Sequence, residues 1–83
     1  MGYRQDLLVS LQASAGSFCR QVFPVPWDEG TWAYLPRGGR FGRAASKETT
    51  LAAACRDVLR EAGLTFTKEN LDRIRVEPLV VVR

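Results

Sequence analysis

Apolar residues recur at helical spacing in the second half of the chain. Leu51, Ala54, Cys55, Val58 and Ala62 share this spacing and would form one apolar stripe. Ser46 is suited to cap the start of such a helix, and Gly63 can end it because glycine tolerates a left-handed backbone. The pattern therefore predicts a main helix over residues 49–62.

Two strands are predicted ahead of that helix. Residues 18–25 are rich in aromatic and β-branched side chains, which favour a strand, and Pro24 and Pro26 should end it or confine it to a sheet edge. Residues 28–30 read Asp-Glu-Gly, a turn signal, so residues 31–35 are predicted to return as the partner strand.

The ends of the chain complete the pattern. Residues 6–11 fit either a helix face or a short buried strand. Residues 68–73 predict a short second helix, and residues 75–82 a last strand whose three final valines are typical of burial on both faces. The whole indicates an α/β (α+β) fold, a small mixed or antiparallel sheet packed on one main helix. At 83 residues we expect a single domain, 1–83.

Composition narrows the chemistry. The net charge of +3 permits contact with nucleic acid or with an acidic protein surface without requiring either. The chain has no histidine, which excludes Ser-His-Asp and Cys-His catalysis and removes the commonest zinc ligand. No apolar run approaches the length of a membrane span, so we expect no membrane association.

Cys19 and Cys55 are far apart and form no C-x-x-C motif. The interpretation favoured is two small, buried, reduced residues, which predicts a cytoplasmic or other reducing compartment. A single disulfide is the alternative.

A basic, glycine-rich segment lies before the main helix. Arg37, Arg40 and Arg43 stand among three glycines, with Lys47 close behind. Glycines allow close backbone approach and arginines supply forked donors, so these four cations are candidates for binding phosphate or nucleic acid. The alternative is a solvated connection.

Three aromatic residues flank the predicted turn: Trp27, Trp32 and Tyr34. Aromatic side chains anchor many protein interfaces, which makes these residues candidates for partner binding. Mutual packing over a small core is the other interpretation.

The polar positions of the main helix carry the remaining candidate chemistry. The periodicity places Arg56, Asp57, Arg60 and Glu61 opposite the apolar stripe. Asp57 and Glu61 are one turn apart, so their carboxylates are neighbours. They could form surface ion pairs or could hold a hard cation such as Mg²⁺ against a phosphate.

The segment Gly42-x5-Glu48-x7-Arg56-Asp57-Val58-x-Arg60-Glu61-x-Gly63-Leu64 resembles the Nudix box, G-x5-E-x7-R-E-U-x-E-E-x-G-U, where U is aliphatic. The resemblance covers residues 32–64 when the preceding strand and Gly-rich loop are included. It implies an Mg²⁺-dependent phosphohydrolase acting on nucleoside-diphosphate compounds, with Glu48, Asp57 and Glu61 as metal ligands. Arg60 stands where the family has a glutamate, which places a positive charge in the implied metal site.

These observations favour a noncatalytic protein-binding module, such as an accessory subunit, adaptor or inhibitor, on a small Nudix-like scaffold. The expected partner is another protein or a larger complex, and no cofactor is expected unless the Nudix mechanism holds. The first alternative is the Mg²⁺-dependent hydrolase. The second is nucleic-acid or phosphate binding through the basic loop.

Overall fold

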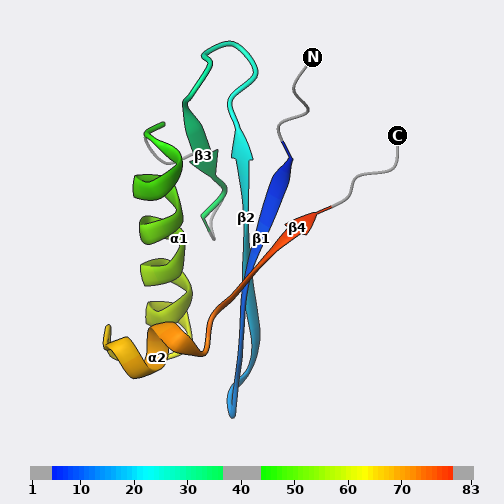
Figure 1. The fold of residues 1–83 in the computed structure, drawn as a ribbon. Helices are drawn as coiled ribbons and strands as arrows, with labels where there is room; N and C mark the ends of the chain where they lie inside the picture. The colour runs from blue at the N-terminus through cyan, green and yellow to red at the C-terminus, as the bar shows by residue number, and fades with distance from the viewer. Residues whose placement is uncertain (1–4, 37–43, 80–83) are drawn as a thin grey trace.

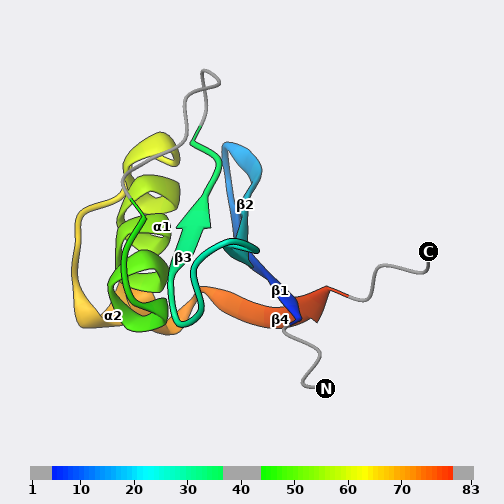
Figure 2. The same ribbon diagram turned by 90° about the horizontal axis from the view of Figure 1, so that it is seen from above.

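The computed structural model describes residues 5–36 and 44–79, which form a four-stranded sheet covered by one main helix. The elements in chain order are β1 (Asp6–Ala13), β2 (Gly16–Pro24), β3 (Trp32–Tyr34), α1 (Lys47–Glu61), α2 (Lys68–Asp72) and β4 (Arg75–Leu79). The strand order is β3-β2-β1-β4, and every neighbouring pair is antiparallel. Helix α1 lies along one face of this sheet (Figures 1 and 2). The α+β prediction is thus confirmed, and the sheet is antiparallel.

Residues 6–11, which fit a helix or a strand, belong to strand β1. Strand β1 pairs with β2 through a tight turn in which Ala13 faces Gly16. Val9 and Leu11 are fully or almost fully buried beneath α1, whereas Ser10 between them is only partly buried. This alternation is the period of a strand. A helix would not have placed Val9 and Leu11 on one face while turning Ser10 away.

Helix α1 begins and ends with the predicted caps. It starts two residues before the predicted position, and the Ser46 hydroxyl accepts a hydrogen bond of 3.3 Å from the Thr49 amide. Gly63 follows the helix with a φ of 75°, and the Leu64 amide donates back to the Leu59 carbonyl at 2.9 Å. These local signals were readable from sequence because caps depend on neighbouring residues only.

The core lies between α1 and the sheet. Its buried members are Val9, Leu11, Val22, Trp32, Ala54, Val58 and Leu59. Thr50 is also buried and donates its hydroxyl to the Trp32 carbonyl at 3.1 Å, which joins α1 to β3. Within the predicted apolar stripe, Leu51, Cys55 and Ala62 are only partly buried and pack around this core.

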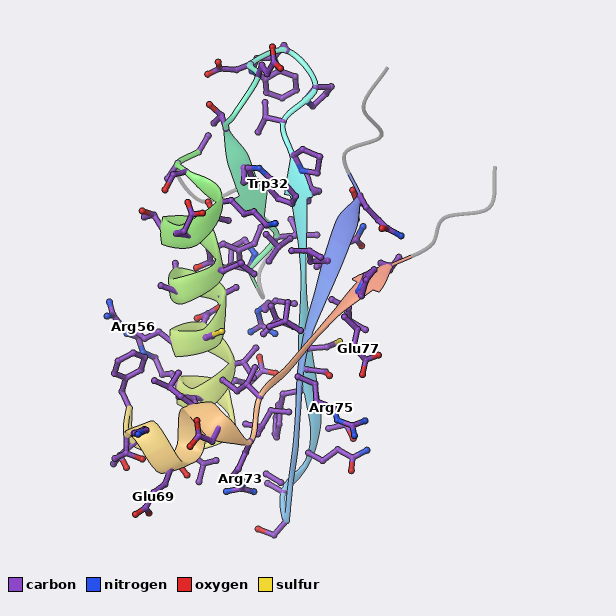
Figure 3. All side chains as sticks on the ribbon, in the orientation of Figure 1. Trp32, Arg56, Glu69, Arg73, Arg75 and Glu77 are labelled. Atoms are coloured by element: carbon purple, nitrogen blue, oxygen red, sulfur yellow. The ribbon has the colours of Figure 1, made fainter. Side chains whose placement is uncertain are left out.

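The last strand, β4, lies at an edge of the sheet. It pairs with β1, and its Val76 side chain is 46% exposed because α1 extends over β1, β2 and β3. Arg75 and Glu77 point away from the helix side of the sheet (Figure 3). A proline such as Pro78 is compatible with an edge strand, because one side of an edge strand has no hydrogen-bonded neighbour. The three valines predicted to be buried lie at 80–82, outside the described residues.

Neither described helix is long and apolar enough to cross a membrane. Helix α2 ends one residue earlier than predicted, after Asp72, and has no buried residue. It serves as a short connection that leads the chain from α1 back to the sheet.

Candidate functional site

A buried arginine on β2 forms the most unusual polar site among the described residues. Arg20 is paired across the strands with Val9, and its neighbours on the same face, Phe18 and Val22, contact the core. The alternation of β2 therefore points Arg20 at α1, where its side chain is only 7% exposed. A charged residue in such a row needs partners, because burying an unpaired charge is very unfavourable.

Helix α1 supplies these partners. The Arg20 Nε donates to Asp57 Oδ2 at 3.1 Å, and Nη2 donates to Glu61 Oε2 at 2.7 Å. The remaining terminal nitrogen, Nη1, donates to the Cys19 carbonyl at 2.7 Å. We refer to Arg20, Asp57 and Glu61 as the Arg20 cluster. All three guanidinium nitrogens are thus engaged by oxygen atoms.

The two carboxylates stabilise the charged form of Arg20. Desolvation is the largest single influence on the Arg20 pKa and lowers it, but hydrogen bonds and charges from Glu61 and Asp57 together outweigh it. The pKa of Arg20 is therefore raised above its ordinary value. With two carboxylates around one guanidinium, the cluster has a formal charge of one negative unit.

The helix periodicity explains why Asp57 and Glu61 face the sheet. Glu61 is seven residues after the fully buried Ala54, close to two complete turns, so both lie on nearly the same side of α1. Asp57 lies one turn before Glu61. The prediction that these two carboxylates are opposite the apolar stripe is wrong, because they are at its flank and half-buried.

Arg56 and Arg60 do lie on the exposed side of α1. Arg56 points away from the sheet (Figure 3), and its guanidinium carbon is 4.9 Å from the centre of the Phe66 ring. This distance fits a cation–π contact. The four polar residues predicted as one face are therefore divided between two sides of the helix.

The three carboxylates suggested as Mg²⁺ ligands are not brought together. Glu48 is exposed in the first turn of α1, nine residues before Asp57, which corresponds to about 13 Å along the axis. Among the described residues, no group of three or more His, Cys, Asp or Glu side chains is placed to hold a metal ion. Since Arg20 also occupies Asp57 and Glu61, the side chains of this site do not fit a divalent cation.

The three aromatic residues suggested for partner binding have different surroundings. Trp32 is 8% exposed and belongs to the core, with the Lys47 ammonium 5.4 Å from its ring centre. Tyr34 is partly buried against the same core. Trp27 is 84% exposed. Its side chain alone among these three is presented to solvent.

The basic loop can be followed only in part. Arg37, Arg40 and Arg43 lie outside the described residues. Lys47, the fourth suggested phosphate ligand, is the first residue of α1 and stacks on Trp32.

A depression of about 600 Å³ lies beside the Arg20 cluster, along the part of β2 that extends past β3. Phe18, Phe23, Leu35 and Pro36 contribute its apolar walls, with Arg20 and Glu61 among its polar lining. It is open to the surface, and it encloses no set of free acid–base groups among its described lining.

The two cysteines are free thiols. Cys19 is exposed on the sheet face away from α1, so the prediction that both cysteines are buried is wrong for this residue. Cys55 is partly buried on α1, and desolvation raises the pKa of its thiol.

Sequence reasoning missed Arg20 as a site residue. The signal present in the sequence was a lone arginine in an otherwise strand-like segment, which by itself also fits an exposed edge position. Comparison with known proteins does not assign the chain to a family: no family model matches it, and no curated protein or solved structure matches it significantly.

Proposed function

We propose that this chain is a noncatalytic module that binds another protein. The observation that carries the noncatalytic part is the Arg20 cluster. Asp57 and Glu61, the carboxylate pair best suited to chemistry, are held by one buried guanidinium at 3.1 and 2.7 Å. A carboxylate committed to a fixed cation is a poor general base and a poor metal ligand, because the competing positive charge would have to be displaced first.

The binding part is supported by apolar side chains left in solvent. Trp27, Leu35 and Val76 are between 46% and 84% exposed. Large apolar side chains, tryptophan above all, supply much of the binding energy at protein interfaces. A domain of this size has a thin core, and surface left uncovered within the domain is available to a partner.

The proposal is tested by affinity purification of the full chain from its native host, followed by size-exclusion chromatography with light scattering. We expect a defined complex with a fixed ratio of chain to partner. The matched control is the Val58→Asp variant. Val58 is fully buried, so a charged side chain at this position should unfold the domain and abolish specific capture. A wild-type chain that stays monomeric and captures nothing beyond the control would contradict protein binding.

The hydrolase alternative is tested on the same preparation. We expect no Mg²⁺-dependent phosphate release from a panel of nucleoside-diphosphate compounds above the level of the Glu61→Gln variant. Release by the wild-type chain that disappears in Glu61→Gln would overturn the noncatalytic proposal in favour of the hydrolase.

A further inference from the structure

The connection between β2 and β3 presents an exposed tryptophan in a hydrogen-bonded turn. This connection stands beyond the end of the sheet and of α1 (Figure 1). We define the hairpin tip as Pro26, Trp27, Asp28 and Glu29. Within it, the Trp27 residue is 84% exposed. Val25 and Thr31 frame the turn and are hydrogen bonded to each other through their backbones.

Backbone bonds fix the shape of the tip. The Val25 amide donates to the Thr31 carbonyl at 2.8 Å, and the Thr31 amide donates to the Asp28 carbonyl at 3.2 Å. Val25 is buried to 2% exposure and so anchors the first arm of the turn in the domain. Gly30 closes the second arm with a φ of 84°, a conformation that favours glycine.

The hydrogen-bonded turn matters for binding because a backbone that already has a defined shape loses less conformational freedom when a partner binds. The backbone at Trp27 is held in this way, and its side chain is presented to solvent. Its indole offers a large apolar surface together with one N–H donor.

The charge of the hairpin tip indicates which kind of surface it would bind. Asp28 and Glu29 follow Trp27 directly and are exposed. Within residues 5–36 and 44–79, neither carboxylate has an ion-pair partner. The tip is thus locally acidic although the whole chain has a net charge of +3. Complementary charge around the indole would steer a basic surface toward it.

We infer that the hairpin tip docks Trp27 into an apolar pocket of a partner protein whose rim carries lysine or arginine side chains. This inference rests on the protein-binding function proposed above and names the surface and the kind of partner. A lipid surface would also accept an indole, but anionic headgroups repel Asp28 and Glu29. Charge complementarity therefore favours a basic protein surface.

The experiment begins with a photoreactive phenylalanine at position 27 of the full chain, and at position 66 as the control. Phe66 is a second exposed aromatic, 51% exposed, on a different part of the molecule. We expect a protein to be crosslinked from position 27 and not from position 66. That protein is then purified and titrated against unlabelled variants.

In the titration, Trp27→Ala should weaken binding at least about tenfold, whereas Phe66→Ala should change it less than about twofold. The Asp28→Asn/Glu29→Gln double variant should bind several-fold more weakly at low salt and should lose most of the salt dependence. Equal affinity of wild type and Trp27→Ala would overturn the inference while leaving protein binding intact. Absence of any captured protein with the wild-type chain would instead remove the proposed function.

Binding to lipid vesicles tests whether Trp27 enters a membrane surface and not a protein pocket. Phosphatidylcholine vesicles, alone or mixed with phosphatidylglycerol, should leave the tryptophan emission of the chain unchanged. A blue shift on vesicle addition that is lost in Trp27→Phe would overturn the protein-docking inference in favour of a membrane surface.

Discussion

Arg20 and its two acidic partners differ in how easily water can reach them. Arg20 is 7% exposed, while Asp57 and Glu61 are 25% and 18% exposed. If the guanidinium is removed, the carboxylates can turn toward solvent. If the carboxylate charges are removed, the guanidinium stays buried without a counter-charge. The two kinds of substitution should therefore have unequal effects on stability.

We expect the Asp57→Asn/Glu61→Gln variant to lose about 3 kcal/mol of unfolding free energy, because it leaves a buried cation uncompensated. Arg20→Met should lose less, about 2 kcal/mol, which is the order of a charged hydrogen bond. Urea unfolding measures both, with the exposed Arg60→Met as the control, expected within about 0.5 kcal/mol of wild type. A larger loss in Arg20→Met than in the double variant would contradict this description of the cluster.

The two thiols should also differ. Cys19 is exposed, whereas Cys55 is partly buried and its pKa is raised by desolvation. Since the thiolate is the reactive form, iodoacetamide should modify Cys19 first near neutral pH. Mass spectrometry of the Cys19→Ser and Cys55→Ser variants reads out the two rates. Comparable rates would show that Cys55 is more accessible than its surroundings indicate.

The raised pKa of Cys55 also predicts how the unfolding free energy changes with pH. The Cys55 thiol holds its proton more tightly in the folded state than in the unfolded chain. As the pH rises past the ordinary thiol pKa, the unfolded chain therefore binds fewer protons than the folded state. Unfolding free energy should therefore fall in alkaline solution and fall less in Cys55→Ser. Identical alkaline profiles of the two proteins would contradict this coupling.

Among the secondary-structure elements, the two helices differ in how strongly they are packed into the domain. Helix α1 packs on three strands, whereas α2 has no buried residue. The unfolding of the whole domain should therefore respond to the caps of α1 more than to those of α2.

We expect Ser46→Ala to lower the unfolding free energy by about 1 kcal/mol, because the Thr49 amide loses its side-chain acceptor. Thr67 caps α2 in the same way, by accepting from the Asn70 amide at 3.2 Å. Thr67→Ala should nevertheless have the smaller effect on thermal unfolding. The opposite order would mean that α2 contributes more to the domain than its exposure indicates.

At the scale of the whole molecule, the two tryptophans have separate roles. Trp32 belongs to the core between α1 and the sheet, and Trp27 lies outside it. A domain of this size has little stability to spare. A cavity in this core should therefore unfold a measurable fraction of the molecules.

Trp32→Ala should lose about 3 kcal/mol or more, since it removes a large buried side chain, and Trp27→Ala should stay within about 0.5 kcal/mol of wild type. Circular dichroism during urea unfolding measures both variants. The same Trp27→Ala protein serves in the binding experiment, so a stable fold combined with lost binding would separate docking from folding.

The features that depend on neighbouring residues could be predicted from the amino-acid sequence alone. Helix α1, its Ser46 and Gly63 caps, and the turn before β3 follow from spacing and backbone preference over a few positions. The α+β class followed because periods of two and of 3.6 residues are visible along the chain.

The remaining features depended on how the chain packs in three dimensions. Residues 6–11 became a strand because β2 and β4 pair with them, and such pairing is not local. Arg20 meets Asp57 and Glu61 across 37 and 41 residues of chain, and Trp32 is buried while Trp27 is exposed. Identical residue types thus acquired different roles, since burial and ion pairing depend on what packs opposite a side chain and not on its neighbours in sequence.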